Sequence, residues 1–531
     1  MNSDLLNLPD DAAALKEIIA FHLNEKEKFQ ERIDYLEQMV GLLQKELFGR
    51  KSEKHILPDH EQRSLFDPVE APESDRRIFE EKIVIPEHTR KKRGRKPLPA
   101  DLPRVDVVHD LPEQEKQCDC GATLSCIGQD VSEKLDYVPA KIRVIRHIRY
   151  KYACKSCEGV DSDGPTVKIA PSPVQLIPKS IASEGLIAHL VVSKFADGLP
   201  LYRQQKIFSR LGIDLSRATM ANWVVNAARH CRPLMDLLQR EIRSGPLINI
   251  DETPYQVLNE PGRRNTSKSY MWVFKGGIED RPALLYQYHR TRSGEAAFNF
   301  LGDYQGYVQS DAFSGYERLS GKKGVTHVGC WAHARRNFVH VINAKKKNRS
   351  KRIQPKSLAD EALKFIGRLY QIEKQAKIKK LEPKQIYQLR QEKAKPVLEA
   401  FKLWLTAKQQ ITPPKGLLGK AINYTLNHWE KLIVYIEDGR LSPDNNAAEN
   451  AIRPFVVGRK NWLFAGHPNG AEAGAIFYSL VETAKINGLE PYNYLRYIFE
   501  RLPLAQTDQD YKNLMPQFVD KKDLTSSLLN Q

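Results

Sequence analysis

Between residues 247 and 338, short apolar segments alternate with helical ones, and this alternation constrains the fold more than any other feature. Three strands are expected in PLINIDETPYQV, KSYMWVFKGG and RPALLYQYHRTRSG, then a helix in GEAAFNFLGDY, then a strand at the start of both GYVQSDAFSGYERL and GVTHVGCWAHARRNF. This order predicts a mixed α/β sheet. The chain has 531 residues, too many for one hydrophobic core, so the sheet is expected to be one domain of several.

Two aspartates, Asp251 and Asp311, are each predicted at the end of an apolar strand. If these strands are neighbours, the two carboxylates meet at one edge, where like charges are costly unless a cation lies between them. Carboxylate oxygens suit Mg²⁺, which also takes substrate phosphate as a ligand. A third carboxylate would complete a two-metal site for cutting or joining phosphodiesters. An aspartate at a strand end is more often structural than catalytic, so the prediction depends on finding the third group.

The segment SPDNNAAENAIRP, residues 442–454, offers that third carboxylate at Glu449. Ser442 is predicted to be the N-cap of a short helix and Pro443 its first residue. Pro454 is expected to limit how far the helix continues.

One face of this helix is polar, because Asn446, Glu449, Asn450 and Arg453 are spaced at three, four and seven residues. One interpretation is a solvated surface helix with a Glu449–Arg453 pair. The other makes Glu449 a metal ligand, places Asn446 and Asn450 beside the ligands or the DNA, and lets Arg453 neutralise phosphate.

The N-terminal segment, residues 11–48, is predicted to be one long helix with an a/d heptad pattern. His22 and Lys26 interrupt the pattern in its middle. The helix either forms a coiled coil that pairs two chains, which we favour, or packs on its own domain. Its two sets of seven-residue repeats are Leu15, His22, Phe29, Leu36 and Leu43, and Ile19, Lys26, Ile33, Val40 and Leu47.

A formal charge of +17 makes a polyanion the expected partner. The polar, proline-bearing segment 51–105 is predicted to be a basic linker. Within it, Arg93, Gly94, Arg95 and Lys96 form an extended strip that resembles an AT-hook and suits the minor groove of A·T-rich DNA. A merely solvated linker is the alternative.

Four of the seven cysteines form two pairs, Cys118 with Cys120 and Cys154 with Cys157. Four thiolates would hold a structural zinc with no open coordination position. The first pair is closer than an ordinary knuckle, so Cys126 is an alternative ligand, and free thiols in a reducing cytoplasm are the alternative to any metal site.

Helical sequence follows, and residues 201–230 have the punctuation of a helix-turn-helix. Gly212 is expected to close the first helix and Ser216 to cap the second. Many helical pairs look like this without binding DNA. If this one does, the residues facing DNA would be Arg203 on the backbone and Arg217, Thr219 and Asn222 at base edges.

Downstream of the sheet strands, GCWAHARR begins a basic helix. Cys330 and His333 could suggest a metal pair, but two ligands are too few, and a structural role with Arg335 and Arg336 facing DNA is the preferred interpretation. The long gap before Glu449 is predicted to hold a helical insertion at about 345–430. Its basic leading segment, Lys345 to Lys356, is expected to be a solvated loop that can meet DNA phosphate.

These motifs together resemble the insertion-sequence-66 family of bacterial transposases. The resemblance covers nearly the whole chain and is carried by LFGRKSEK, INIDETP, SDAFSGY, GCWAHARRNF and SPDNNAAENAIRP. It implies a DDE transposase with an RNase H-like catalytic core, in which the acidic residues fall on Asp251, Asp311 and Glu449. It also implies a zinc-binding module at the four paired cysteines.

The resulting hypothesis is a multidomain α/β enzyme that binds the ends of a mobile DNA element and catalyses strand cleavage and strand transfer. Its cofactors would be two Mg²⁺ ions, with Mn²⁺ as an alternative, and a structural zinc. Its partners would be double-stranded DNA, at least one further copy of the chain, and candidate accessory proteins of the same element. No membrane span is expected, and the location would be cytoplasmic, at the nucleoid. The alternatives are a non-catalytic DNA-binding regulator and a nuclease that cuts without joining.

The expected domains are a leader helix at 1–50, the basic linker at 51–105, the zinc module at 106–170, the helix-turn-helix region at 171–240, the catalytic domain at 241–460 and a C-terminal helical region at 461–531.

Overall fold

The computed structural model describes residues 142–153, 167–311, 313–346 and 357–524, together with positions 19–23, 25–26, 29–30, 32–33 and 36. Two compact units make up the chain: Arg50–Pro171, and Met1–Gly49 with Ser172–Gln531. In the first unit, the described residues form a short antiparallel pair, β1 (Lys151–Ala153) with β2 (Val167–Ile169). In the part of the chain described, no helix combines the length and apolar character needed to cross a membrane.

The described positions between residues 19 and 36 are helical. Several apolar side chains of the heptad pattern are exposed there, among them Ile19, Phe29, Ile33 and Leu36. These side chains are therefore free to pack on another helix, as a coiled coil would require.

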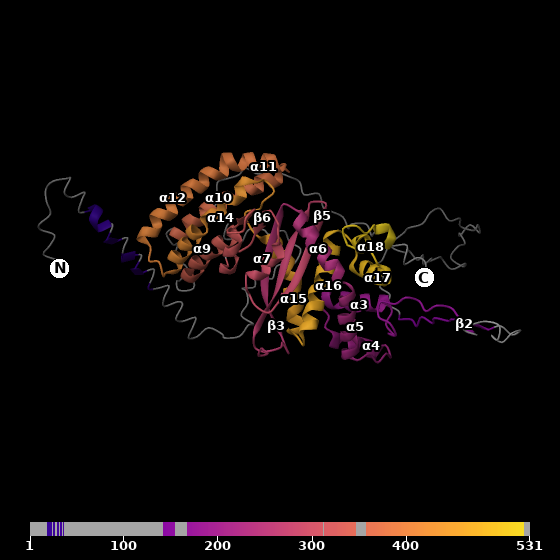
Figure 1. Ribbon diagram of the computed structural model, residues 1–531. Helices are drawn as coiled ribbons and strands as arrows, with labels where there is room; N and C mark the ends of the chain where they lie inside the picture. Colours follow the sequence, from indigo (N-terminus) through magenta and orange to yellow (C-terminus); the bar gives the residue numbers. More distant parts are fainter. Residues whose placement is uncertain are drawn as a thin grey trace, which may run out of the picture. The chain divides into compact units, whose positions relative to one another are not determined.

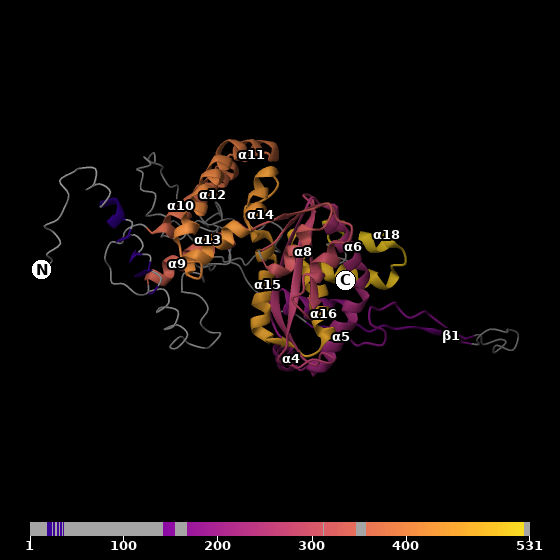
Figure 2. The same cartoon turned by 60° about the vertical axis from the view of Figure 1, so that its left-hand side comes forward.

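The second unit contains the predicted mixed sheet (Figures 1 and 2). Its strands follow the order β5-β4-β3-β6-β7. β3, β6 and β7 are parallel to one another, β4 and β5 are antiparallel to their neighbours, and β8 pairs with the far end of β3. The strands are β3 (Leu247–Val257), β4 (Lys268–Ile278), β5 (Arg281–His289), β6 (Gly306–Gln309), β7 (Val325–Val328) and β8 (Phe464–Ala465).

Helices lie before, between and after these strands. Four precede the sheet: α3 (Glu184–Phe195), α4 (Leu201–Arg210), α5 (Arg217–His230) and α6 (Arg232–Ser244). Four lie between strands β5 and β7 or just after β7: α7 (Glu295–Leu301), the 3₁₀-helix η4 (Ser314–Tyr316), α8 (Glu317–Ser320) and α9 (Trp331–Lys346). The chain after the helical insertion contains α15 (Asn446–Trp462), α16 (Pro468–Ile486), α17 (Pro491–Arg501), the 3₁₀-helix η7 (Leu502–Leu504) and α18 (Asp508–Asn513).

The pleat of β3 sends Asp251 and Glu252 to opposite faces of the sheet, since successive side chains alternate. Glu252 lies opposite Trp272 of β4, whose ring packs against Tyr316 on the face covered by η4. Four residues after Asp251 on β3, and on the same face, Tyr255 packs edge-on against Phe455 of α15, their ring centroids 4.9 Å apart. Asp251 therefore shares its face with the helix that carries Glu449.

Helix α16 covers the free edge of the sheet at β5 by pairing its side chains with strand backbone. Ser479 accepts a hydrogen bond from the Tyr286 amide at 2.8 Å, and Thr483 exchanges hydrogen bonds with both backbone groups of Leu284. An uncovered edge strand would present unpaired amides and carbonyls that could pair with another chain. The Ser479 and Thr483 hydroxyls bind these backbone groups instead. The edge cover also fixes the sheet against the C-terminal helices.

The predicted helical insertion forms a second hydrophobic core together with α9 (Figure 1). Its elements are α10 (Leu358–Ile378), α11 (Pro383–Leu389), the π-helix η5 (Arg390–Ala394), α12 (Lys395–Ile411), α13 (Leu417–Asn427), α14 (Trp429–Ile433) and the 3₁₀-helix η6 (Val434–Glu437).

Three local predictions were wrong. Asp251 does not end its strand, because β3 continues to Val257. The helix that carries Glu449 begins at Asn446 with Asn445 as N-cap, not with Ser442, because the Asn445 carbonyl accepts the first helical amides, those of Ala448 and Glu449.

Pro454 does not end this helix either, which runs on to Trp462. A proline removes one helical hydrogen bond, here the one to the Asn450 carbonyl. Asn450 lies on the exposed side of α15, where water can replace that bond.

Candidate active site

The fold brings Asp251, Asp311 and Glu449 together from three elements. Parallel pairing of β3 with β6 aligns residues 247–249 with 307–309, so Asp311, two residues past β6, lies beside Asp251. Helix α15 packs on the same face of β3 and supplies Glu449. Burial, followed by the charge on Glu252, raises the pKa of Asp251 to about 8, and the charges on Asp311 and Glu449 contribute further. Asp251 is therefore close enough to the other two carboxylates for their charges to act on it.

The oxygens of this cluster fit a hard divalent cation. The backbone holds one oxygen of each aspartate: Asp251 accepts the Glu252 amide at 2.9 Å, and Asp311 accepts the Phe313 amide at 3.1 Å. In Glu449, Oε1 is buried without a hydrogen-bond partner. Crowded carboxylates with an unsatisfied buried oxygen are the donor set that Mg²⁺ prefers, because the ion relieves their repulsion.

A network of buried amide side chains holds the start of α15 against the sheet. Asn445 donates to the Ile250 carbonyl at 2.8 Å and accepts from Asn249 at 3.0 Å. Asn249 also donates to Gln309 at 3.0 Å, and Gln309 donates to the Ser442 carbonyl at 2.8 Å. The network joins β3, β6 and the segment before α15, so it fixes Glu449 relative to both aspartates. These polar residues were not predicted from the sequence, because no local pattern distinguishes the buried Asn445 from the exposed Asn446.

We expect Asn445→Ala to lower both stability and activity. The variant leaves the Asn249 donor and the Ile250 carbonyl unpaired in the interior, at a cost of about 1–3 kcal/mol. It also loosens Glu449, and misplacement by about 1 Å can reduce a rate on the order of 100-fold. Urea unfolding and a DNA cleavage assay measure the two effects. Asn446→Ala, at an exposed position next in the chain, is the control for stability; equal stability of the two variants would contradict the role of the network.

Glu252, which was also not predicted as a site residue from the sequence, holds the loop that follows Asp311. It accepts from Arg292 at 2.5 Å and from the Tyr316 hydroxyl. The Arg292 guanidinium lies 3.7 Å from the centre of the Phe313 ring. Phe313 and Tyr316 both belong to the segment after Asp311, so the Glu252–Arg292 pair anchors the loop that carries that aspartate.

Two side chains of α9, a histidine and an arginine, lie near the Glu449 carboxylate. His333 Nδ1 lies 3.8 Å from Glu449 Oε1, and Arg336 lies 3.9 Å from the other carboxylate oxygen. The Cys330 thiol also joins this group: its sulfur, a His333 ring nitrogen and a Glu449 oxygen all lie within 4.8 Å of one another. The sequence argument that Cys330 and His333 were too few for a metal site was therefore incomplete, because the third group comes from a helix more than a hundred residues away.

The predicted DNA-facing residues nearest the carboxylates lie on α15 and α9. On α15, Asn446, Asn450 and Arg453 are exposed along the polar face beyond Glu449. On α9, Arg336 is half-exposed beside Glu449, whereas Arg335 is more covered.

The predicted helix, turn and helix of 201–230 are present as α4 and α5. Gly212 takes a positive φ of 79° after α4, and the Ser216 hydroxyl caps α5 by accepting the Thr219 amide. Arg203, Arg217 and Asn222 are exposed and Thr219 is partly covered.

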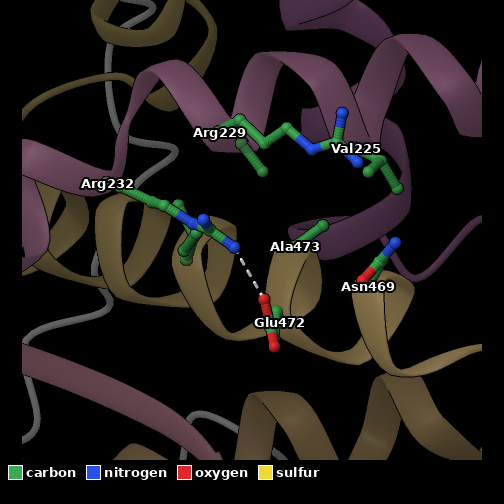
Figure 3. A pocket seen from close by; sticks show the side chains of 8 residues that line it. Val225, Arg229, Arg232, Asn469, Glu472 and Ala473 are labelled. Atoms are coloured by element: carbon green, nitrogen blue, oxygen red, sulfur yellow. Dashed lines mark hydrogen bonds and ion pairs between the residues drawn. The ribbon is translucent and has the colours of Figure 1, made fainter.

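A pocket of about 170 Å³ lies between the end of α5, the start of α6 and the start of α16 (Figure 3). Arg232 pairs with Glu472 across it at 2.9 Å. None of its lining residues is one of the three carboxylates.

Two groups of predicted residues lie outside the part of the chain that the structure describes. They are the cysteines Cys118, Cys120, Cys154 and Cys157, and the strip Arg93, Gly94, Arg95 and Lys96.

Comparison with known proteins gives matches along most of the chain. The family model described as Transposase IS66 family matches residues 179–473, the zinc-finger binding domain of transposase IS66 matches 115–158, and the IS66 C-terminal element matches 479–517. A fourth model, described as Transposase C of IS166 homeodomain, matches 35–107.

Uncharacterized proteins of Sinorhizobium fredii are among the relatives. The chain is 36% identical to y4jD over 77% of its own length and 79% of that protein. It is 31% identical to y4qI over 95% of its own length and 92% of that protein.

Proposed function

Because the chain belongs to the IS66 family of transposases, we propose that it cleaves the ends of a mobile DNA element and transfers the strands to target DNA. The observation that carries the proposal is the convergence of Asp251, Asp311 and Glu449 at one end of the parallel strands, where burial, together with the nearby carboxylate charges, raises the pKa of Asp251. A protein that only binds DNA has no need of three repelling carboxylates at one place, since isolated buried charge is costly.

We also propose that the catalytic domain is RNase H-like. An antiparallel hairpin on one side of β3, parallel strands on the other, and an acidic residue on β3 itself support this assignment. The helical insertion between α9 and α15 would then be an addition to that core.

Asp251, Asp311 and Glu449 would hold two Mg²⁺ ions, with Mn²⁺ as an alternative. When bound, such ions activate the attacking oxygen and stabilise the leaving oxygen of a phosphodiester. In the first step water would cut the strand and leave a 3′-hydroxyl, which would attack target DNA in the second step. Arg453, Asn446 and Asn450, on the exposed face of α15, would bind phosphates next to the reacting one.

The remaining parts would bind DNA and pair the chains. Arg203, Arg217, Thr219 and Asn222 would contact one DNA segment, with Arg335 and Arg336 nearer the carboxylates. The match of residues 115–158 to a zinc-finger domain spans all four paired cysteines and supports a structural zinc at Cys118, Cys120, Cys154 and Cys157. Exposed apolar side chains between residues 19 and 36 support pairing of two copies through a coiled coil.

The test is an assay with purified full-length protein and DNA that flanks its coding sequence. We expect Mg²⁺-dependent cuts at the element ends and joined products with target DNA, all lost with a chelator. DNA binding without cleavage would instead support a non-catalytic regulator. Cleavage without joining would support a nuclease that does not transfer strands.

The raised pKa of Asp251 predicts a pH effect on stability. The folded protein without metal keeps the Asp251 proton up to a pH of about 8, whereas an unfolded aspartate releases it near 3.9. The stability from this group is present at low pH and is lost as the pH rises through that range. In the presence of a chelator, the melting temperature of Asp251→Asn should therefore rise relative to that of the parent protein as the pH goes from 5 to 8. Added Mg²⁺ should raise the melting temperature of the parent protein most at pH 8. A difference that does not change with pH would contradict this.

A further inference from the structure

We propose that Cys330, His333 and Glu449 form a binding site for a zinc-class divalent ion such as Zn²⁺, Co²⁺ or Cd²⁺. The site differs from the proposed magnesium site in its ligands but shares Glu449 with it. Binding of the ion does not depend on the proposed function; only its effect on cleavage does.

The ligand atoms are gathered before any ion binds. The Cys330 sulfur, a His333 ring nitrogen and a Glu449 oxygen lie within 4.8 Å of one another, and His333 Nδ1 is 3.8 Å from Glu449 Oε1. Ligands of one zinc ion stand about 2.0–2.3 Å from it, so atoms at these separations need only small movements to share a metal. Both His333 Nδ1 and Glu449 Oε1 are buried without a hydrogen-bond partner, which is costly unless something binds them.

The surrounding backbone fixes these groups in place. Cys330 immediately precedes α9, and its sulfur accepts the Asn445 amide at 3.3 Å, just before the helix that carries Glu449. The Trp331 amide donates to the Pro443 carbonyl at 2.8 Å, so the two segments are tied together on both sides of the site. The amide orients the sulfur, as outer-shell hydrogen bonds do around metal ligands. Burial raises the pKa of the free Cys330 thiol, so a bound cation would take the place of its proton.

The donor set selects the kind of ion. A thiolate and an imidazole favour zinc-class ions and disfavour Mg²⁺, which takes oxygen ligands. Cys330 is only 3% exposed, while the side chains of His333 and Glu449 are 24% and 27% exposed. Three ligands with a partly open side leave room for water in the fourth position.

Occupation of this site would engage the Glu449 carboxylate. If Glu449 serves the magnesium site as proposed, zinc-class ions should inhibit Mg²⁺-dependent cleavage by holding that side chain on the side of α9. The site would then make the enzyme sensitive to free zinc through one shared ligand.

The first test measures Co²⁺ binding to the full-length protein by its thiolate-to-metal absorption in the near ultraviolet. We expect the parent protein to bind one more ion with thiolate absorption than Cys330→Ser. The paired cysteines of the N-terminal half are present in both proteins and cancel in the difference. Cys231→Ser, which removes another buried free cysteine, is the matched control and should bind like the parent.

A second variant protects the test against misfolding of Cys330→Ser. His333→Gln changes a partly exposed residue and should weaken Co²⁺ binding at this site at least 10-fold, since even outer-shell changes cost about 10–100-fold. Binding curves of both variants that superimpose on the parent curve would overturn the proposal.

The consequence for activity is a separate measurement. The zinc concentration that halves Mg²⁺-dependent cleavage should rise at least 10-fold in His333→Gln and in Cys330→Ser. If the two variants lose the extra Co²⁺ site but the parent protein never cleaves DNA, the proposed function is refuted and the metal site stands. If the parent cleaves DNA but the variants bind Co²⁺ as it does, the metal site is refuted and the proposed function stands.

Discussion

Asp251→Asn is expected to abolish Mg²⁺-dependent cleavage and strand transfer, by a factor on the order of 1,000 or more, as loss of a central catalytic group does. The variant keeps the shape of the side chain and removes the charge that would hold the cation. Asp251 lies on β3, the strand between β4 and β6, and the charges on Asp311 and Glu449 both raise its pKa. Neither of these neighbouring carboxylates can take its place without moving. Gel assays of end cleavage and joining measure the loss.

DNA binding is the internal control for this variant. Its affinity should stay within a few-fold of the parent value, because phosphate contacts come from other residues. Asp280→Asn is the matched substitution: it removes an exposed carboxylate between β4 and β5 and should leave cleavage intact. Strand transfer by Asp251→Asn at the parent rate would refute the catalytic assignment.

Arg390→Met is expected to cause the largest loss of stability among single substitutions in the helical insertion. Arg390 is 2% exposed and makes a two-pronged pair with Glu373, at 2.9 and 2.7 Å. It also donates to the backbone carbonyls of Tyr435, Asp438 and Leu441, which belong to the segment leading towards α15. Removing one partner of such a buried pair costs about 3–5 kcal/mol, because the remaining carboxylate and carbonyls lose their donors.

The effect should appear as a lower urea midpoint and as faster hydrogen exchange in α10 and α12. Arg368→Met is the matched control, because Arg368 lies exposed on α10. Glu373→Gln with Arg390→Met should cost less than the sum of the two single changes, since the pair is one unit. A change below about 1 kcal/mol in Arg390→Met would show that this arginine does not hold the insertion together.

The sheet was predictable because its strands are long and apolar and have turn residues between them. The strands at 268–278 and 281–289 and the helix at 295–301 lie where the apolar segments indicated. The helix boundaries around Glu449 were not predictable from local rules. Ser442 and Pro443 carry a stronger local start signal than Asn445, but Asn445 is held at the cap position by tertiary hydrogen bonds, which it donates to the Ile250 carbonyl and accepts from Asn249.

The candidate carboxylates could be found from the sequence, but their supporting groups could not. Asp251 and Glu449 stand in distinctive motifs, whereas Glu252 and Asn249 are neighbours whose burial follows from strand pleat and pairing. Cys330 and His333 became a three-ligand group only when α15 was placed beside α9. Contacts between residues about a hundred positions apart leave no periodic signal in one sequence, so this part of the site required the structure.

Cation-directed backbone cleavage tests the convergence of the three carboxylates most directly. Fe²⁺ replaces Mg²⁺ in the full-length protein, and ascorbate with peroxide then generates radicals that cut the chain next to the bound ion. The account predicts cuts near Asp251, Asp311 and Glu449, all suppressed by excess Mg²⁺ and all lost in Asp251→Asn. Cuts confined to one of these segments, or unchanged in that variant, would contradict a shared cation site.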